Sequence, residues 1–416
     1  MNSKSKEDNL YDILKERGFV QQVTGEEAVR KQFATQQVTV YVGFDPTADS
    51  LHVGNLLGLM ALAHVQRHGH RPIAIIGDGT ALVGDPSGRT ELRQMLSPER
   101  IAENAVKIKT QIGRYFEIDG KKGLAIHNAS WLVDLKYIDV LRDIGRHFSV
   151  NRMLAAEAYK LRMEKGLSFL EFNYQILQAY DFLMLYKNHH CTLQLGGDDQ
   201  WGNILAGVDL IRRVENGEAA GMTWPLLTTA SGQKMGKTAK GAVWLDASKT
   251  SPYEYYQYWV NVDDRDVRRF LAYFTFLPLE EIKKLGRLEG AETRKAKEIL
   301  AYEATKITHG RDEAEKARAA SRSAFAGERK DLSAIPCSYV DLARLKKGIL
   351  AVDIFAEVGL ASSKSAARRL IQQGGAYINE TRIDSIDSVI KDSDLDSQMI
   401  MLRAGRKRYH RVLIEH

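Results

Sequence analysis

Cysteine is scarce in this sequence: only Cys191 and Cys337 occur among 416 residues, and they lie far apart. Two distant cysteines argue against a disulfide scaffold and a cysteine-based zinc site, so we expect no zinc. Long hydrophobic runs are also missing, since no stretch of about 18 apolar residues occurs, and this excludes a transmembrane helix. The polar, acidic start MNSKSKEDNLYDILKERG is unlike a secretory or transit peptide. We therefore expect a cytoplasmic protein with no membrane partner.

What is present is typical of a globular chain of two or three domains. Hydrophobic residues make up 44% and charged residues 27% of the sequence, which excludes a largely disordered chain. The formal net charge of +6 is a mild indication of a polyanionic partner.

The first regular pattern is a strand, a helix and a second strand. Residues 38–44 (VTVYVGF) alternate and are β-branched, residues 51–69 have helical apolar periodicity, and residues 71–79 (RPIAIIGDG) form an apolar run that ends in glycines. Asp49 and Ser50 are candidate N-caps, and Gly69 is a candidate stop. Residues 192–200 (TLQLGGDDQ) predict a further strand. Because loops at the carboxyl ends of parallel strands line the ligand crevice, we expect one site there.

The rest of the chain is mainly helical until its last part. Residues from about 97 to 190, and again from 251 to 323, indicate helices, whereas the periodicity breaks within 327–342 and suggests a linker. The final segment clusters positive charge at Lys364, Arg368 and Arg369 and again between residues 403 and 411.

The stretch SGQKMGKT (231–238) has the residue types of a phosphate-binding P-loop but not its spacing. Only three residues separate Gly232 from Gly236, where a P-loop needs four. Two lysines and a threonine hydroxyl still suit a phosphate chain.

Three further motifs are weak when taken singly. His52, in the first turn of the expected helix, can donate to a phosphate, although a lone surface or capping histidine is the commoner case. Gly54 inside a helix costs about 1 kcal/mol of helix stability relative to alanine. A glycine at such a position often allows another group, such as an adenine ring, to approach closely. GDPSGRTELRQ (84–94) and GGDDQWGN (196–203) can be ordinary turns with caps.

A polar stripe in an apolar helix is more informative. Tyr174, Gln178 and Asp181 are spaced i, i+4 and i+7 within YQILQAYDFLML, so they share one face. A buried polar stripe must find partners. It forms either an internal hydrogen-bonded network or one wall of a pocket for a small polar ligand with an apolar body.

The order and spacing of these motifs resemble the bacterial tyrosyl-tRNA synthetases, a family of class I aminoacyl-tRNA synthetases. HVGN (52–55) and KMGKT (234–238) stand where the class has His-Ile-Gly-His and Lys-Met-Ser-Lys-Ser. YVGFDPTADSLHVGN, GDPSGR, YQxxQAYDF and GGDDQWGN are similar to other motifs of the family. The resemblance covers essentially the whole chain.

The resemblance implies an α/β fold and four segments. We expect a Rossmann-like parallel-sheet catalytic domain at 1–245 with a helical insertion at about 115–190, and an α-helical domain at 246–330. A linker at 331–345 and a small S4-like α+β RNA-binding domain at 346–416 would follow. It also implies a homodimer.

The implied reaction joins L-tyrosine and ATP, with Mg²⁺, into tyrosyl-adenylate and pyrophosphate, and then transfers tyrosine to tRNA(Tyr). By this resemblance the phosphates would meet these groups: Thr47, His52, Asn55, Arg89, Arg93, Lys234, Lys237 and Thr238. The rest of the ATP site would be Gly43, Asp45, Gly54, Gly197 and Asp199. Asn55 and Gly236 depart from the family pattern, since they replace a histidine and a serine.

The resemblance also assigns the tyrosine and tRNA contacts. Tyr41 and Asp181 would bind the phenolic hydroxyl, and Gln200 would lie by the substrate carboxylate. Asp85, Tyr174 and Gln178 would hold the ammonium group. Candidates for tRNA contact are Asn151, Trp201, Lys364, Arg368, Arg369, Arg406, Lys407 and Arg408. The alternatives are the sister synthetase for tryptophan and a non-catalytic RNA-binding relative.

Overall fold

The computed structural model describes residues 9–87, 96–163, 166–230, 232, 235–238, 241–326, 335–396, 398–405 and 408–415. The chain divides into two units whose segments alternate along the sequence. The first unit comprises Met1–Lys237, Ala242–Lys249 and Val262–Ala296. The second comprises Thr238–Gly241, Thr250–Asn261 and Lys297–His416.

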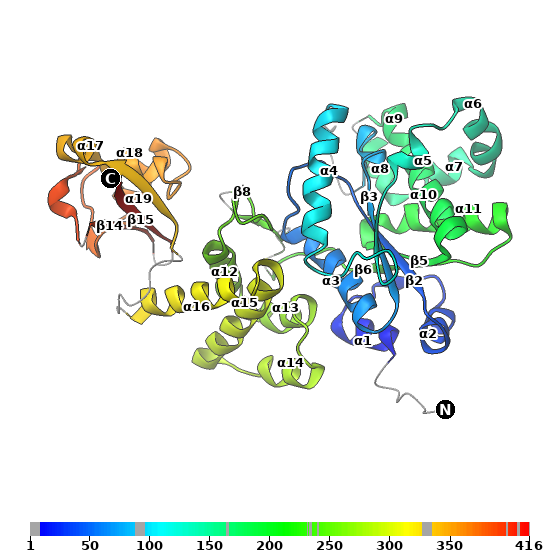
Figure 1. The fold of residues 1–416 in the computed structure, drawn as a ribbon, viewed down its shortest axis with the longest axis horizontal. Coiled ribbons are helices and arrows are strands. Elements are labelled where there is room, and N and C mark those ends of the chain that lie inside the picture. Colours follow the sequence, from blue (N-terminus) through cyan, green and yellow to red (C-terminus); the bar gives the residue numbers. More distant parts are fainter. Residues whose placement is uncertain are drawn as a thin grey trace. The chain divides into compact units, whose positions relative to one another are not determined.

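A six-stranded sheet in the order β1-β6-β5-β2-β3-β4 forms the centre of the first unit (Figure 1). Its strands are β1 (Gln22–Val23), β2 (Thr39–Phe44), β3 (Arg71–Ile76), β4 (Leu124–His127), β5 (Cys191–Gly197) and β6 (Ala220–Trp224). Neighbouring strands are parallel except that β1 runs antiparallel to β6. The expected parallel α/β sheet is therefore confirmed.

Three strands of this sheet, β1, β4 and β6, differ from the sequence expectation. β4 lies within the stretch from 97 to 190 that was predicted to be mainly helical, and neither the two-residue β1 nor β6 was predicted. β4 has four residues, all only half-buried, so it carries neither the alternation nor the continuous apolar run that marks a strand.

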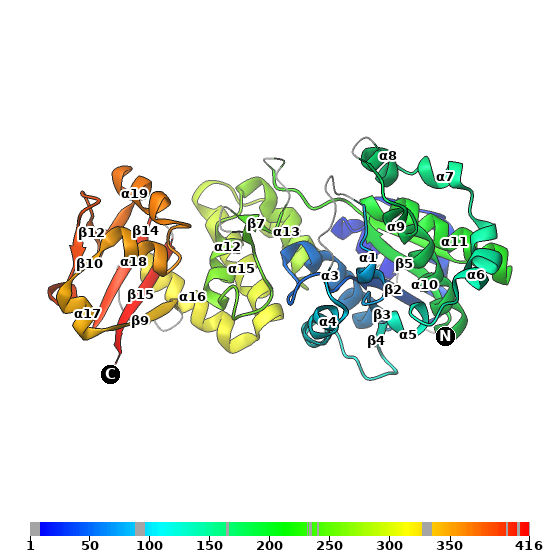
Figure 2. The ribbon, with the colours of Figure 1, turned by 90° about the horizontal axis from the view of Figure 1, so that it is seen from above.

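Helices cover both faces of the sheet. α3 (Val53–Arg67) and α4 (Pro98–Ile112) lie on one side, and α10 (Tyr174–His189) and α11 (Trp201–Glu215) lie on the other (Figure 2). Right-handed crossovers explain this, because the chain moves outward from β2 through β3 to β4 and then in the opposite direction from β5 to β6. The order of strands thus reverses between β2 and β5, which is where such sheets bind ligands.

The other helices of the first unit are short. They are α1 (Leu10–Arg17), α2 (Glu26–Thr35), α5 (Ala129–Leu132), α6 (Tyr137–Asp139), α7 (Val150–Leu154), α8 (Glu157–Met163), α9 (Phe169–Phe172), α13 (Val267–Phe274) and α14 (Leu279–Leu285). Two short strands, β7 (Lys237–Thr238) and β8 (Gly241–Ala242), lie at the first boundaries between the two units along the sequence.

Some of the helices that were expected between 251 and 323 belong to the second unit, whereas α13 and α14 belong to the first. α12 (Pro252–Val260) starts with a capping box between Ser251 and Glu254, and α15 (Thr293–His309, most of it in this unit) and α16 (Arg311–Ala326) follow. Its buried contacts include the Tyr255 hydroxyl, 3.0 Å from Thr308 Oγ1, and Gln257 Nε2, which donates to Ser321 Oγ at 2.8 Å.

A five-stranded sheet in the order β12-β11-β14-β15-β9 forms the C-terminal part of the second unit. Its elements are β9 (Cys337–Asp341), α17 (Leu342–Lys347), β10 (Ile349–Leu350), α18 (Ala351–Glu357), α19 (Lys364–Gln372), β11 (Ala376–Ile378), β12 (Thr381–Arg382), β13 (Val389–Ile390), β14 (Met399–Ala404) and β15 (Arg408–Glu415). β9 pairs in parallel with β15, so residues 337–341 belong to the sheet although the sequence suggested a linker there. Its side chains alternate only weakly in burial, which hides the strand in the sequence.

Candidate functional site

A cavity of about 610 Å³ opens at the carboxyl ends of β2 and β5, at the reversal of strand order. Polar side chains and glycines from several strands, helices and loops meet there. Of the residues predicted from the sequence, its lining includes Tyr41, Gly43, Asp45, Thr47, His52, Asn55, Asp85, Tyr174, Gln178, Asp181, Gly197 and Gln200. The structure therefore brings together two groups of residues that were assigned to different substrates.

The deepest polar groups are those of Tyr41 and Asp181, both almost fully buried. The Tyr41 hydroxyl has no hydrogen-bond partner among the described residues, and burial raises its pKa well above the ordinary value. Burial also raises the pKa of Asp181 to about 7. A buried hydroxyl without a partner is costly, so the pair suits a ligand that supplies a hydrogen-bonding group.

Two residues that the sequence did not reveal hold the Asp181 carboxylate. Asn128 Nδ2 donates to Oδ2 at 2.8 Å, and Trp131 Nε1 donates to Oδ1 at 2.7 Å. Asn128 follows β4 directly, as Asp45 follows β2, so an observer who recognised that strand could have predicted a polar residue at its end.

A chain of hydrogen bonds joins the predicted residues Asp85, Gln178 and Gln200. Gln200 Nε2 donates to Asp85 Oδ2 at 2.8 Å. Asn203 Nδ2 lies 2.9 Å from Gln178 Oε1 and 3.2 Å from Gln200 Oε1. Asn203, which is buried, was also missed, because it lies one turn beyond Gln200 on α11 and its role depends on the packing of α10 against α11.

Asp45 and Tyr174 contact one another. The Tyr174 hydroxyl donates to Asp45 Oδ2 at 2.9 Å, and Thr80 Oγ1 donates to Oδ1 at 2.8 Å. The polar stripe of α10 therefore has internal hydrogen-bond partners and also faces the cavity. It forms both an internal network and one wall of a pocket, the two alternatives that the sequence left open.

His52 is the N-cap of α3, whereas the sequence suggested Asp49 or Ser50. The Nδ1 atom of its ring accepts from the backbone N–H of Gly54 at 3.0 Å. The backbone N–H of His52 donates to Asn55 Oδ1 at 3.1 Å. A neutral imidazole that accepts at Nδ1 carries its proton on Nε2. His52 and the amide group of Asn55 thus both bring N–H donors to the first turn of the helix.

Gly54 and Gly236 lie against each other at this helix start. A Cβ on Gly54 would lie 2.7 Å from His52 Cε1, so the close approach that the glycine permits is that of the capping ring. Gly236 has φ +83°, and a Cβ there would lie 3.0 Å from the Gly54 nitrogen. Lys234, Arg89 and Arg93 lie outside the described residues, and only the backbone of Lys237 and Thr238 is described.

A second pocket, of about 700 Å³, includes Asp199 and Trp201 in its lining. Asn151 is exposed on α7, and the three basic residues predicted on α19 are exposed as well. Arg408 is exposed on β15, whereas Arg406 and Lys407 lie outside the described residues.

Comparison with known proteins gives consistent matches along the chain. The family described as tRNA synthetases class I (W and Y) matches residues 33–326. The family described as Tyrosine--tRNA ligase SYY-like C-terminal domain matches residues 336–412.

Individual relatives match over almost their whole length. The Tyrosine--tRNA ligase of Syntrophus aciditrophicus is 56% identical over 98% of this chain and 99% of its own. That of Clostridium botulinum (strain Loch Maree / Type A3) is 51% identical over 98% of this chain and all of its own. A solved structure of a C-terminally truncated mitochondrial tyrosyl-tRNA synthetase of Aspergillus nidulans is 33% identical and has a TM-score of 0.69. It covers 77% of this chain and 94% of its own.

Proposed function

The chain belongs to the tyrosine–tRNA ligases of class I and joins tyrosine to tRNA, and we propose that the cavity between β2 and β5 is where ATP first activates the tyrosine. In this step an oxygen of the tyrosine carboxylate attacks the α-phosphorus of ATP. The bond from that phosphorus to the bridging oxygen breaks, and pyrophosphate leaves. A ribose hydroxyl at the 3′ end of tRNA(Tyr) then attacks the activated carbonyl carbon, and AMP leaves. The unpartnered hydroxyl of Tyr41 next to Asp181 is the observation that carries the proposal.

The buried end of the cavity receives the phenol ring. The substrate hydroxyl donates to Asp181 and accepts from Tyr41. Asn128 and Trp131 already occupy one position on each carboxylate oxygen, which fixes its orientation before the substrate binds. Phenylalanine would leave both groups buried without this partner, which is the physical basis of its rejection.

The polar network beyond the ring holds the amino-acid part of the substrate. Asp85, Tyr174 and Gln178 bind the ammonium group, and Gln200 lies beside the carboxylate. Hydrogen bonds from Gln200 to Asp85 and from Tyr174 to Asp45 support this, because they fix the acceptors in place. Holding the attacking oxygen near the α-phosphorus removes much of the entropic barrier.

The start of α3 receives the phosphates. Thr47, Nε2 of His52 and the amide of Asn55 face them together with the positive end of the helix. Lys234, Lys237, Thr238, Arg89 and Arg93 would neutralise the charge that moves onto pyrophosphate, which lowers the barrier without covalent chemistry. Gly43 and Gly197 line the cavity beside the nucleotide. Gly54 and Asp199 are not part of its lining, and we propose that they complete the ATP site, with Asp199, from the second pocket, accepting from the ribose.

Magnesium accompanies the nucleotide in this proposal. The described part of the chain holds no group of three or more His, Cys, Asp or Glu side chains that could bind a metal ion. Magnesium prefers a few carboxylates plus substrate phosphates, so we expect the ATP phosphates to carry it.

The C-terminal segment, 346–416, is proposed as an S4-like RNA-binding domain, preceded by the α-helical domain 246–330 and a catalytic domain, 1–245, with its insertion at about 115–190. Exposed Lys364, Arg368 and Arg369 on one helix support the RNA role, because phosphate binding needs clustered cations. Asn151 and Trp201 would contact tRNA from the catalytic domain, and Arg406, Lys407 and Arg408 would extend the C-terminal surface. The expected place of action is the cytoplasm, where tRNA is charged for translation.

We propose that the partner of the first unit is a second copy of this chain. Large exposed apolar side chains concentrate in the insertion and on the edge of the second pocket, and they are Val133, Tyr137, Ile138, Leu141, Val150, Met163, Phe169, Leu170, Leu205 and Leu226. Apolar surface of this extent on one unit is typical of a protein interface.

Among the described residues, no helix has both the length and the apolar character that a membrane span requires.

ATP–pyrophosphate exchange, with tyrosine, phenylalanine and tryptophan offered separately, tests the proposed site. Exchange with tyrosine alone is expected. Exchange with tryptophan would contradict the roles of Tyr41 and Asp181, and absence of exchange with all three would contradict adenylation in this cavity.

A further inference from the structure

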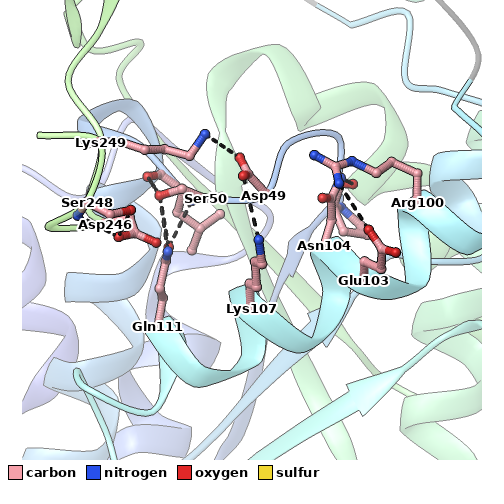
Figure 3. A network of polar contacts seen from close by, with 12 residues as sticks. Asp49, Ser50, Arg100, Glu103, Asn104, Lys107, Gln111, Asp246, Ser248 and Lys249 are labelled. Atoms are coloured by element: carbon pink, nitrogen blue, oxygen red, sulfur yellow. Dashed lines mark hydrogen bonds and ion pairs between the residues drawn. The ribbon is translucent and has the colours of Figure 1, made fainter.

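Asp49, which sequence analysis treated only as a helix cap, lies between two lysines from different parts of the chain (Figure 3). Its carboxylate is 2.6 Å from Lys249 Nζ and 3.8 Å from Lys107 Nζ. Asp49 belongs to the loop between β2 and α3, Lys107 to α4, and Lys249 to the segment that follows β8. Lys249 lowers the pKa of Asp49, so the carboxylate is charged at neutral pH.

α4 holds the same loop through a polar face. Asn104, Lys107 and Gln111 are spaced i, i+3 and i+7 and therefore point to one side of the helix. Asn104 Nδ2 donates to the carbonyl of Pro46 at 3.0 Å, and Gln111 Oε1 accepts from the backbone N–H of Leu51 at 2.9 Å. Both side chains are buried, so the backbone on each side of Asp49 is fixed by α4.

Lys249 connects this loop to the cavity wall. The backbone before it pairs with the start of α3, with Leu245 N–H donating to Leu51 O at 2.9 Å. Lys249 Nζ also lies 5.1 Å from the centroid of the Trp244 ring, within the range of a cation–π contact. Trp244 lines the cavity, and its ring centroid is 6.0 Å from that of His52.

We propose that Lys249 and Asp49 are positioning residues for tyrosine adenylation, which hold the Thr47 loop and Trp244 in place beside His52. This rests on the proposed role of Thr47 and His52 in binding the phosphates of ATP. An exposed ion pair would contribute little by itself. Here, however, the ammonium group of Lys249 contacts both the loop and the ring, so its loss frees two parts of the phosphate end together. The tyrosine end, at Tyr41 and Asp181, shares neither contact.

The test compares Lys249→Met with Lys249→Arg and with Lys15→Met in single-turnover formation of tyrosyl-adenylate by the full-length protein. Lys15 is a matched control in the same unit, because its Nζ pairs with Glu26 at 2.5 Å and lies 5.8 Å from the Tyr11 ring centroid. We expect Lys249→Met to slow adenylate formation on the order of fivefold and to raise the ATP requirement, with unchanged tyrosine affinity. Arginine retains the charge and the ring contact, so Lys249→Arg should restore most of the rate.

Asp49→Asn gives an independent measurement. If the pair acts as one unit, the double variant Asp49→Asn, Lys249→Met should lose no more than the larger single loss. A Lys249→Met effect no larger than that of Lys15→Met would overturn the proposal, and so would an equal loss of tyrosine affinity. Should Asp49→Asn fail to fold, the variants at Lys249, which is exposed, still decide the question. Lack of tyrosine-dependent exchange in the wild-type protein would instead contradict the proposed site itself.

Discussion

The carboxylate of Asp181 accepts hydrogen bonds from Asn128 and Trp131. Asp181→Asn would place an NH₂ group where one of these donors, or the substrate hydroxyl, needs an acceptor. We expect the ratio of adenylate formation rates for tyrosine over phenylalanine to fall at least about tenfold, because a hydrogen bond to a charged group is lost. Asp85→Asn is the control, since it affects an ammonium group that both substrates share. A ratio that Asp181→Asn leaves unchanged would contradict the assigned pocket.

The raised pKa of Asp181 predicts a pH dependence. Its carboxyl keeps its proton up to about pH 7 because burial disfavours the charged form. The substrate phenol donates to the ionised form, so kcat/KM for tyrosine should rise as pH increases through about 7 and then level off. Rates of adenylate formation at tyrosine concentrations well below KM give kcat/KM at each pH. If the same inflection persists in Asp181→Asn, another group is responsible for it.

Residues at the site differ in how well the sequence predicts them. Tyr41, Asp85, Gln178 and Asp181 could be predicted because each stands in a local motif. Asn128 and Asn203 could not, because their roles depend on which strands and helices become neighbours. Long-range packing, and not residue type, therefore limits which site residues can be predicted from the sequence.

At the scale of elements, the start of α3 depends on Gly54. A Cβ there would lie 2.7 Å from Cε1 and 2.9 Å from Nδ1 of His52, so Gly54→Ala should displace the capping imidazole. We expect slower adenylate formation with little change in melting temperature, because alanine favours the helix by about 1 kcal/mol while the cap is lost. Single-turnover kinetics and thermal unfolding check the two effects.

Gly113→Ala, at the end of α4, is a matched control. A Cβ on Gly113 would have no neighbour closer than 3.6 Å, and its φ is −62°. If Gly54→Ala is as active as Gly113→Ala, the His52 cap is not needed for adenylation.

Elements with a clear period could be predicted, and those with long-range partners could not. β2, α3 and β3 follow their apolar patterns closely. The cap of α3 was misplaced because Asp49 and Ser50 have the residue types of caps, yet their side chains contact Lys249 and Gln111. Competition between local and distant partners is not visible in one sequence.

On the scale of the whole molecule, the C-terminal part of the second unit should serve tRNA and not adenylation. Ile335 and Met401 pack with Tyr253 and Ala320, and β9 begins at Cys337, so removal of residues 327–416 is a cleaner cut than one at 346. We expect the truncated protein to keep ATP–pyrophosphate exchange and to lose tRNA charging.

Because the truncation exposes apolar surface, a full-length variant is needed as a second test of the RNA-binding role. Arg368→Glu with Arg369→Glu reverses two exposed charges on α19 and should also lower charging, with a weaker dependence on salt. Intact charging in both proteins at moderate tRNA concentration would contradict an RNA-binding role.

Self-association makes a separate prediction at this scale. Leu205 is 38% exposed on the edge of the second pocket, and Leu205→Asp should give a monomer in sedimentation and reduced charging. Leu350→Asp, at a residue 43% exposed in the other unit, should remain dimeric. A monomeric wild-type protein would contradict the proposed dimer.

The alternation of segments between the two units has a consequence for the newborn chain. α12 is synthesised before the residues of α13 and α14, yet its partners in the second unit, Thr308 and Ser321 among them, are made later. At about 5–20 residues per second, the ribosome delays these partners by seconds. Until they emerge, the rings of Tyr255 and Trp259, which are fully buried in the folded protein, lack their contacts with the later helices. A nascent chain arrested near residue 300 should therefore bind a chaperone that a completed chain does not.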